Sequence, residues 1–370
     1  MTGPVGPQGA GPQGCGPQGA RPQRVLVTGG SGFLGAEICR QLVGRGTETA
    51  SLSRRPSTAL DRLGVRQHLG DLADADAVGK AVTGCDAVIH NAALAGVSGP
   101  LRPYWTTNVD GTRNILDQCR AHGVRTLVYT STASVVFRTG GLENADERAP
   151  YPERHLAAYP LSKARAEALV LRADSSDLAT VSLRPHLIWG PDDPHFLPAL
   201  TRAARGRHLI MPGRGTNLVD TTHLRTAAHA HLLALDRLHR GGPVNGRAYF
   251  IAQGEPCPLA GMATLYLAAT GIRAAWHSVP PALAHGAATV QEAVARFTGS
   301  ARTHTLSRFL VNELTHPHWF DITAARRDLG FTPPVGLVDG LRELAHTSGR
   351  PEILNRALAE FAGPWNPTDK

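Results

Sequence analysis

The segment Arg24–Gly35, RVLVTGGSGFLG, is the feature that most constrains how this chain can fold. An apolar run typical of a strand is followed by three glycines at a spacing of three, Gly29, Gly32 and Gly35, and then by a helical pattern. Glycine lets the backbone turn tightly and approach a pyrophosphate, whose charge the N-terminus of a helix stabilises. The pattern therefore predicts a dinucleotide-binding turn, although an ordinary tight turn is the alternative in a chain with 40 glycines.

Short apolar runs alternate with longer helical stretches through the first half of the chain. The expected strands are Arg24–Gly29, Thr47–Ser53, Arg66–Leu72, Asp86–Ala93, Arg125–Thr132 and Leu178–Pro185. The expected helices between them are Leu34–Gly46, Asn108–Val124 and Tyr159–Ala173. This alternation is typical of βαβ units, so it predicts an α/β fold with a doubly wound parallel sheet, the Rossmann fold. Such sheets bind ligands at the carboxyl ends of their strands.

The pattern becomes less regular after Pro185, which indicates a smaller, mostly helical substrate-binding region. Residues 1–23 repeat GPQG at a period of five, which breaks the every-third-glycine rule of collagen and leaves little to bury, so we expect a disordered tail. The expected division is a tail at 1–23, a nucleotide-binding Rossmann domain at 24–188, a substrate-binding region at 189–350, and a C-terminal helix and tail at 351–370.

Composition excludes several classes of function. The formal net charge of +8 comes without a basic block interleaved with aromatic residues, so we expect no nucleic-acid partner. The five cysteines are scattered without metal-ligand spacing, which predicts reduced thiols and no metal site. We find neither a secretory signal nor an apolar run of the roughly 18 residues that span a bilayer, so a cytoplasmic protein is expected.

The end of the second expected strand discriminates between the two nicotinamide dinucleotides. It carries Ser53, Arg54 and Arg55 where an NAD-binding protein has an acidic residue for the ribose hydroxyls. Two guanidiniums suit a 2′-phosphate, so NADP is expected over NAD, with a solvated basic turn as the alternative. Asp71 and Leu72 follow the third strand, where they are candidates for contact with the adenine, or an exposed loop acid and its neighbour.

Tyr159 and Lys163 lie four residues apart in YPLSK, on one face of an expected helix. Reduction of a carbonyl needs a proton donor, and a neighbouring ammonium is expected to lower the pKa of the Tyr159 phenol. Ser131, Thr132 and Ser134 end the fifth strand, where a hydroxyl could hydrogen-bond a substrate carbonyl or simply form a turn. Asn108 is a candidate for holding a water in a relay to Lys163, with a helix cap as its ordinary role.

Together TGGSGFLG, HNAA, NVDGT, YTSTASV, YPLSK and RPHLIWGP resemble the extended short-chain dehydrogenase/reductase family, in its 3β-hydroxysteroid dehydrogenase-like branch. The resemblance covers roughly residues 24–350. It implies a catalytic Tyr159 and Lys163, and it favours Thr132 over Ser131 as the third member. Its motifs also imply cofactor contacts at Phe33, Leu34, Asn91, Ala92, Ala93, Tyr159, Lys163 and Pro185, with Lys163 binding the nicotinamide ribose.

A closer similarity, in GDLADADAV, VDTTHL, AYFIAQGEP, SRFLVNELTHPHWF and ARRDLGF, is to bacterial reductases of 2-alkyl-3-oxoalkanoic acids in long-chain olefin biosynthesis. It implies NADPH-dependent reduction of a hydrophobic keto acid, and association with other enzymes of that pathway. Extended relatives also imply a homodimer. The substrate carboxylate needs a partner, for which His186, His223 and Arg225 are candidates.

Three other functions stay open at this point. A hydroxysteroid dehydrogenase would run the reverse oxidation, and a sugar-nucleotide epimerase or dehydratase shares every cofactor motif. A non-catalytic NADP-binding regulator usually lacks the Tyr159 and Lys163 pair that this chain keeps.

Overall fold

The computed structural model describes residues 21–96, 98–205, 208–298 and 306–361 of the chain. Of the expected tail at 1–23, residues 1–20 lie outside the described residues, as does the C-terminal stretch 362–370. The described chain starts at Arg21, whose guanidinium lies 3.3 Å from the carboxylate of Asp236.

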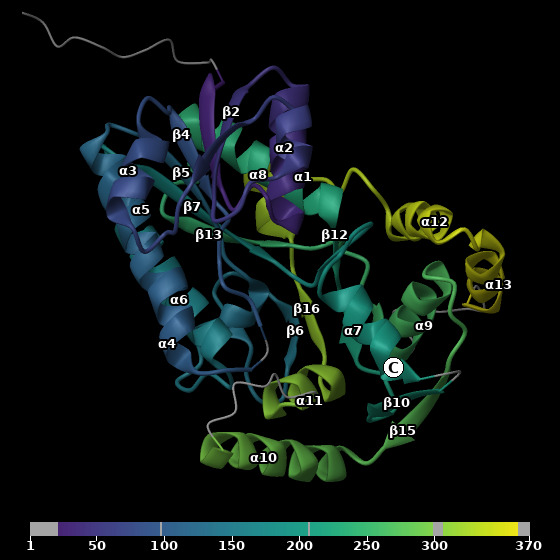
Figure 1. Cartoon of the computed structure of the whole chain (residues 1–370). Coiled ribbons are helices and arrows are strands. Elements are labelled where there is room, and N and C mark those ends of the chain that lie inside the picture. Colours follow the sequence, from purple (N-terminus) through teal and green to yellow (C-terminus); the bar gives the residue numbers. More distant parts are fainter. Residues whose placement is uncertain (1–20, 97, 206–207, 299–305, 362–370) are drawn as a thin grey trace, which may run out of the picture.

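Seven parallel strands form the central sheet, in the order β13-β7-β5-β4-β1-β2-β3 (Figure 1). They are β1 Arg24–Thr28, β2 Glu48–Ser53, β3 Arg66–Leu69, β4 Ala87–His90, β5 Thr126–Thr130, β7 Ala179–Pro185 and β13 Arg247–Ile251. The strand order reverses between β1 and β4, and ligands of such sheets bind at the carboxyl edge beside this reversal. The prediction of a doubly wound parallel sheet is confirmed.

Helices cover both faces of this sheet (Figure 1). One face carries α1 Phe33–Gly44, α2 Thr58–Arg62 and α8 Leu224–His239; the other carries α3 Ala75–Val82, α5 Gly111–Ala121 and α6 Ala158–Arg172. Val25 and Val27 of β1 pack toward α1 and α8, whereas Leu26 between them packs toward the other layer. Because successive side chains of a strand point to opposite faces, these three consecutive apolar residues serve a strand that is covered on both faces.

The second half of the chain adds further helices and three small sheets. Its helices are α7 Phe196–Ala203, α9 Leu259–Ala269, α10 Pro281–Thr298, α11 Arg308–Thr315, α12 Leu337–Ser348 and α13 Pro351–Phe361. One small sheet pairs β8 Ile188–Trp189 with β12 Thr222–His223. A second has the order β15 Ala275–Val279, β10 His208–Pro212 and β9 Ala204–Arg205. The third has the order β14 Cys257–Pro258, β11 Leu218–Val219, β16 His318–Phe320 and β6 Leu142–Ala145. Strands this short carry too little alternation for the sequence to predict them.

Two parts of the fold differ in detail from the sequence expectations. The helix expected from Asn108 begins earlier, with α4 Leu101–Tyr104 and the π-helical turn Trp105–Asp110, before α5. Strand β13 and helix α8 come from the segment assigned to substrate binding, yet β13 pairs with β7 and α8 packs on β5 and β7. The division at residue 188 therefore stays a prediction. No helix in the part of the chain that the structure describes is long and apolar enough to cross a membrane.

The turn between β1 and α1 yields a stability test. A Cβ at Gly35 would overlap the carbonyl oxygen of Gly29, and backbone on both sides leaves no room to relax. Overpacking of this kind costs about 1–3 kcal/mol, so we expect Gly35→Ala to lower the melting temperature. Gly44→Ala at the end of the same helix is the matched control, because nothing lies within 4 Å of its added Cβ. Equal melting temperatures for the two variants would contradict this packing.

Candidate active site

The glycine turn forms a cradle of backbone at the carboxyl end of β1. Gly29 has φ +70, a conformation that favours glycine, and a Cβ there would lie 2.9 Å from the Cα of Ala92. The amide of Gly32 donates to the carbonyl of Gly29 at 2.9 Å. Gly32 caps α1 without any side-chain hydrogen bond, so backbone amides of the first helical turn stay open to an anion. The glycines leave space for a pyrophosphate to approach the backbone, and the unbonded amides of α1 can donate to its oxygens.

The expected adenosine-side residues gather beside this turn. The amide of Ser31 donates to Ser53 Oγ at 3.2 Å, which ties the end of β2 to the glycine turn. The amide of Gly70 donates to the carbonyl of Ser53 at 3.1 Å, which brings Asp71 close. Arg54 and Arg55 are exposed, and neither guanidinium forms an ion pair or hydrogen bond with another residue of the described ranges. Two uncompensated cations at this place suit a phosphate group.

The remaining expected cofactor contacts lie at the same edge of the sheet. Phe33 and Leu34 open α1, Asn91 to Ala93 follow β4 directly, and Pro185 ends β7. The amide of Ala92 donates to Thr28 Oγ1 at 3.0 Å, which anchors the segment after β4 against β1. The structure thus brings the ends of β1, β2, β4 and β7 together, as the sequence suggested.

Tyr159, Lys163 and Thr132 converge at the carboxyl end of β5. Thr132 caps a short 3₁₀ turn, Ala133–Val136, where its Oγ1 accepts from the amide of Ser134 at 3.3 Å, and its hydroxyl is near enough to Tyr159 to lower the pKa of the phenol. Lys163, one turn after Tyr159 on α6, is only 2 % exposed. Its Nζ donates to the carbonyl of Thr130 at 2.5 Å and lies 4.2 Å from the ring centroid of Tyr129. A proton donor, a hydroxyl and an amine are therefore held within one small volume.

Burial controls the protonation of this group. It raises the pKa of Tyr159 to about 12, against the opposing hydrogen bond from Thr132. Burial also lowers the pKa of Lys163 to about 7, against the opposing charge of Glu167. The expected lowering of the phenol's pKa by Lys163 is not what the protein alone shows, because the amine is turned toward the carbonyl of Thr130. Tyr159 is therefore fully protonated at neutral pH, as a proton donor must be.

Asn108 acts as a clamp within the π-helical turn. Its Nδ2 donates to the carbonyl of Leu94 at 3.0 Å and to Ser162 Oγ at 2.9 Å, and its Oδ1 accepts from the amide of Leu94 at 2.7 Å. These bonds fasten the segment after β4 to α6 next to Lys163. The expected water relay through Asn108 stays a prediction, and the clamp is the role that its contacts describe.

The three proposed partners of the substrate carboxylate all contact other residues, but Nε2 of His223 has no hydrogen bond among the described residues and lies 3.7 Å from the carboxylate of Glu343. His186 is buried, and its Nε2 lies 2.7 Å from His318 Nδ1. His223 is also buried, and its Nδ1 accepts from the amide of Arg225 at the start of α8. The guanidinium of Arg225 pairs with the carboxylate of Glu343. A role for these three residues toward a substrate stays a prediction.

Sequence reasoning missed a buried ion pair behind the amine of Lys163. Glu167, one turn after Lys163 on α6, accepts from Arg184 Nη2 at 2.8 Å, from Tyr151 Oη at 2.6 Å and from Ser182 Oγ at 2.8 Å. Both charged side chains are at most 5 % exposed. The signal was the continuation of YPLSK to Glu167 on the same helical face, since a carboxylate there needs a buried cation.

A second missed network runs through His90, whose burial lowers its pKa to about 3. Thr112 Oγ1 donates to the carbonyl of Asn108, so it accepts from His90 Nε2 at 3.0 Å. With the proton of the neutral ring on Nε2, His90 Nδ1 accepts from Thr28 Oγ1 at 2.8 Å, and Thr28 Oγ1 also accepts from the amide of Ala92. This chain of hydrogen bonds joins β1, β4 and the turn that holds Asn108.

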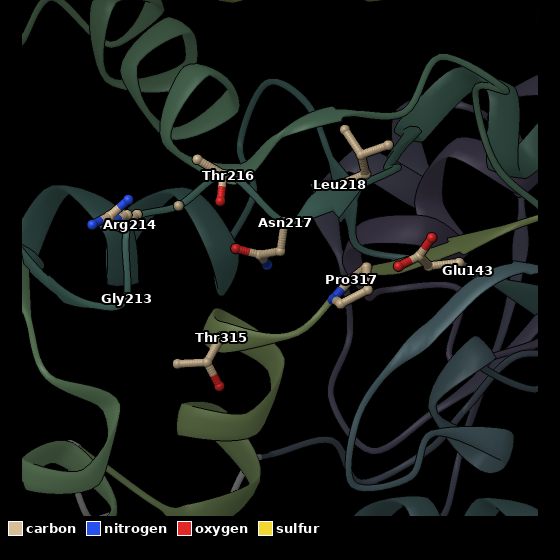
Figure 2. Close-up of a pocket in the computed structure, with 9 residues that line it drawn as sticks. Glu143, Gly213, Arg214, Thr216, Asn217, Leu218, Thr315 and Pro317 are labelled. Atoms are coloured by element: carbon tan, nitrogen blue, oxygen red, sulfur yellow. The ribbon is translucent and has the colours of Figure 1, made fainter. Parts of the chain in front are cut away.

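A pocket of about 270 Å³ lies away from this cluster (Figure 2). It opens between α11 and the loop 213–218, with Arg214 and Glu143 at opposite ends and Asn217 between them. None of the expected site residues lines it. The chemistry therefore points to the carboxyl edge of the large sheet and not to this pocket.

Comparison with known proteins agrees with this geometry. The model of the 3-beta hydroxysteroid dehydrogenase/isomerase family matches residues 26–278. The chain is 44% identical over 328 residues to a 2-alkyl-3-oxoalkanoate reductase of Stenotrophomonas maltophilia, covering 88% of this chain and 99% of that protein. It is 39% identical to the protein of the same name from Shewanella oneidensis, covering 86% of this chain and 84% of that one.

Solved structures extend the similarity to the fold. The crystal structure of gox2253 has a TM-score of 0.71 and 26% identity, and covers 89% of this chain and 98% of its own. The UDP-glucose 4-epimerase of Thermus thermophilus, in complex with NAD, has a TM-score of 0.65 and 25% identity, and covers 88% and 99%.

The ion pair behind Lys163 yields a prediction. Removing one partner of a buried pair leaves the other charge uncompensated, at a cost of about 3–5 kcal/mol. We therefore expect Glu167→Ala to lower the free energy of unfolding by that amount in a denaturant titration. Asp117→Ala, which removes the exposed 3.9 Å pair with Arg120, should change it little. Similar losses in both variants would show that the buried pair has no special structural role.

Proposed function

The chain belongs to the 3-beta hydroxysteroid dehydrogenase/isomerase family and is an NAD(P)-dependent oxidoreductase of the extended short-chain type. From this premise we propose that it uses NADPH to reduce the 3-keto group of a 2-alkyl-3-oxoalkanoic acid to the 3-hydroxy acid. The convergence of Tyr159, Thr132 and Lys163 beside the glycine turn is the observation that carries the proposal. The two bacterial relatives named as 2-alkyl-3-oxoalkanoate reductases, similar over most of the chain, support the substrate class.

The residues of the chain account for the proton chemistry of this reduction. A bound reduced nicotinamide would supply the hydride for the keto carbon. The electrons of the carbonyl double bond move to the oxygen, and Tyr159 donates its phenolic proton there. Thr132, whose hydroxyl lies near the phenol, would hydrogen-bond the same oxygen. The Tyr159 phenolate left behind is stabilised by that hydroxyl and by Lys163 in its ammonium form.

The preference for NADPH rests on Arg54 and Arg55. Both follow β2 directly, both are exposed, and the residues that the structure describes give neither a counter-charge. A 2′-phosphate would bring the negative charge that these guanidiniums lack. The homodimer, the cytoplasmic location and the association with other enzymes of olefin biosynthesis stay predictions.

Tyr159→Phe tests the proposed proton donor. General acid catalysis contributes about 10² to 10⁴ in rate, so we expect kcat for a 2-alkyl-3-oxo acid to fall by that factor. NADPH binding, followed by nicotinamide fluorescence, should stay near the wild-type level, because the glycine turn, Arg54 and Arg55 are unchanged in this variant. Near-normal turnover by Tyr159→Phe would remove Tyr159 from the mechanism.

A double substitution tests the cofactor. Loss of both guanidiniums in the Arg54→Ala, Arg55→Ala variant removes charge-assisted hydrogen bonds to a 2′-phosphate, each worth about 1.5–3 kcal/mol. We expect the Kd for NADPH to rise at least tenfold while the Kd for NADH changes little. Arg66→Ala serves as the control for the loss of positive charge, because Arg66 is exposed and starts β3, at the sheet edge opposite to Arg54 and Arg55. Parallel weakening of both dinucleotides would argue against phosphate recognition at this position.

A further inference from the structure

Helix α11 from the C-terminal half packs directly against the turn that carries Thr132. The ring of Phe309 meets the ring of Phe137 edge to face, with centroids 5.9 Å apart. Asn312 Nδ2 donates to the carbonyl of Arg138 at 3.2 Å. Figure 1 shows α11 at the end of the small sheet formed by β6 and β16. Helix α11 therefore borders the turn that carries Thr132, next to the proposed proton donor.

The backbone of Glu313 in this helix is held by a pair of buried histidines. Its carbonyl can only accept, so His318 Nε2 donates to it at 2.8 Å. His318 Nδ1 must then accept, and His186 Nε2 donates to it at 2.7 Å. Burial lowers the pKa of His318 to about 4 and that of His186 well below its usual range. The pair is neutral at physiological pH, so it positions Glu313 without offering a cation to a substrate.

Glu313 follows Phe309 by four residues on α11, so it lies on the helix face that contacts Phe137. Its charge is close enough to Tyr159 to raise the pKa of the phenol. No hydrogen bond or ion pair with another residue of the described ranges engages its carboxyl oxygens. The residue is half-buried. Burial raises its own pKa to about 8, so the group is mostly a neutral acid at pH 7.

We propose that Glu313, as a carboxylic acid, donates a hydrogen bond to the carboxylate of the 2-alkyl-3-oxo acid whose keto oxygen is held by Tyr159 and Thr132. This inference rests on the proposed function and assigns the carboxylate subsite of the same site. It makes Glu313 a specificity-determining residue that distinguishes 3-oxo acids from ketones without the acid group.

In a 3-oxo acid the keto group and the carboxylate are close enough together to reach Tyr159 and α11 at the same time. The carboxyl carbon is two single bonds from the keto carbon, so a keto oxygen at Tyr159 places the carboxylate within a few ångström of the phenol. Two ionised carboxylates would repel each other there, whereas an acid and a carboxylate share a short, charge-assisted hydrogen bond. His186 is hydrogen-bonded to His318 and Arg225 is paired with Glu343, while the unbonded Nε2 of His223 lies 3.7 Å from the same Glu343 carboxylate. Glu313 is the candidate that lies within electrostatic range of Tyr159.

The other titratable groups near Glu313 set the pH range in which it can be observed. Burial raises the pKa of Tyr104, whose ring centroid lies 6.4 Å from that of Tyr159, and both phenols stay protonated up to pH 9. The histidines at 318 and 186 stay neutral above pH 6. Lys163 titrates near pH 7 and acts on any ketone. Neighbouring segments add the exposed side chains of Arg138 and Glu143 and the ring of His316, which is hydrogen-bonded to Thr315 Oγ1 and the Asn312 carbonyl. Helix α10, packed against α11, adds Glu292, whose carboxylate pairs with Arg308 at 2.8 Å.

The experiment compares a 2-alkyl-3-oxo acid with its methyl ester, which keeps the ketone and both alkyl chains but lacks the charge. The ratio of KM for the acid to KM for the ester cancels the titration of groups that act on both substrates. For the wild type we expect this ratio to rise about tenfold from pH 7 to pH 9, as a donor with a pKa near 8 loses its proton. Glu313→Ala should raise the ratio at pH 7 by about 10- to 100-fold, the value of a charge-assisted hydrogen bond.

Glu313→Gln separates this role from a structural one. Its amide is a permanent donor of nearly the same shape, so we expect a ratio near the wild-type value at pH 7 that no longer changes up to pH 9. An equal loss with acid and ester in Glu313→Ala, or an unchanged ratio, would overturn the inference. If Glu313→Ala gives one of these two results while the wild type reduces the acid normally, the inference about Glu313 fails but the proposed function stands. If the wild type reduces neither compound, the proposed function itself fails.

Discussion

The carbonyl oxygen of Gly29 occupies the space that a side chain at position 35 would need. This close approach of two backbone segments determines how the residues of the site are arranged around the turn. It lets β1 turn at once into α1 and leaves the first amides of the helix open. Ala92 from β4 and Ser53 from β2 are then held against the same turn. A dinucleotide laid across these strand ends reaches the end of β5, where Thr132 and Tyr159 meet.

Burial then determines what each titratable group can do. It keeps Tyr159 protonated as an acid, holds His90, His186 and His318 neutral as spacers, and keeps Glu313 largely uncharged beside the phenol. The pair of Glu167 and Arg184 is the exception, because its charges are matched and its oxygens have further donors. A site built mainly from neutral donors suits a substrate that brings its own negative charge.

Local pattern was enough to predict six strands of the large sheet and their carboxyl edge, because strands buried on both faces are largely apolar and the close backbone contacts after β1 favour glycine. It could not predict the short strands of the small sheets, nor that β13 pairs with β7 in the large sheet, since both depend on contacts distant in sequence. The role of Glu313 was not predicted, for the same reason. The residue lies about 150 positions after Tyr159, and only the packing of Phe309 on Phe137 brings its helix to the site.

A crystal structure of the protein with NADP and the 3-hydroxy acid product tests the central claim most directly. We expect the pyrophosphate over the glycine turn, the nicotinamide beside Tyr159, the product's hydroxyl oxygen within hydrogen-bond distance of Tyr159 and Thr132, and its C3 about 3.5 Å from the nicotinamide C4. A phenol turned away from that oxygen, or a product bound in the pocket beside Asn217, would contradict the account.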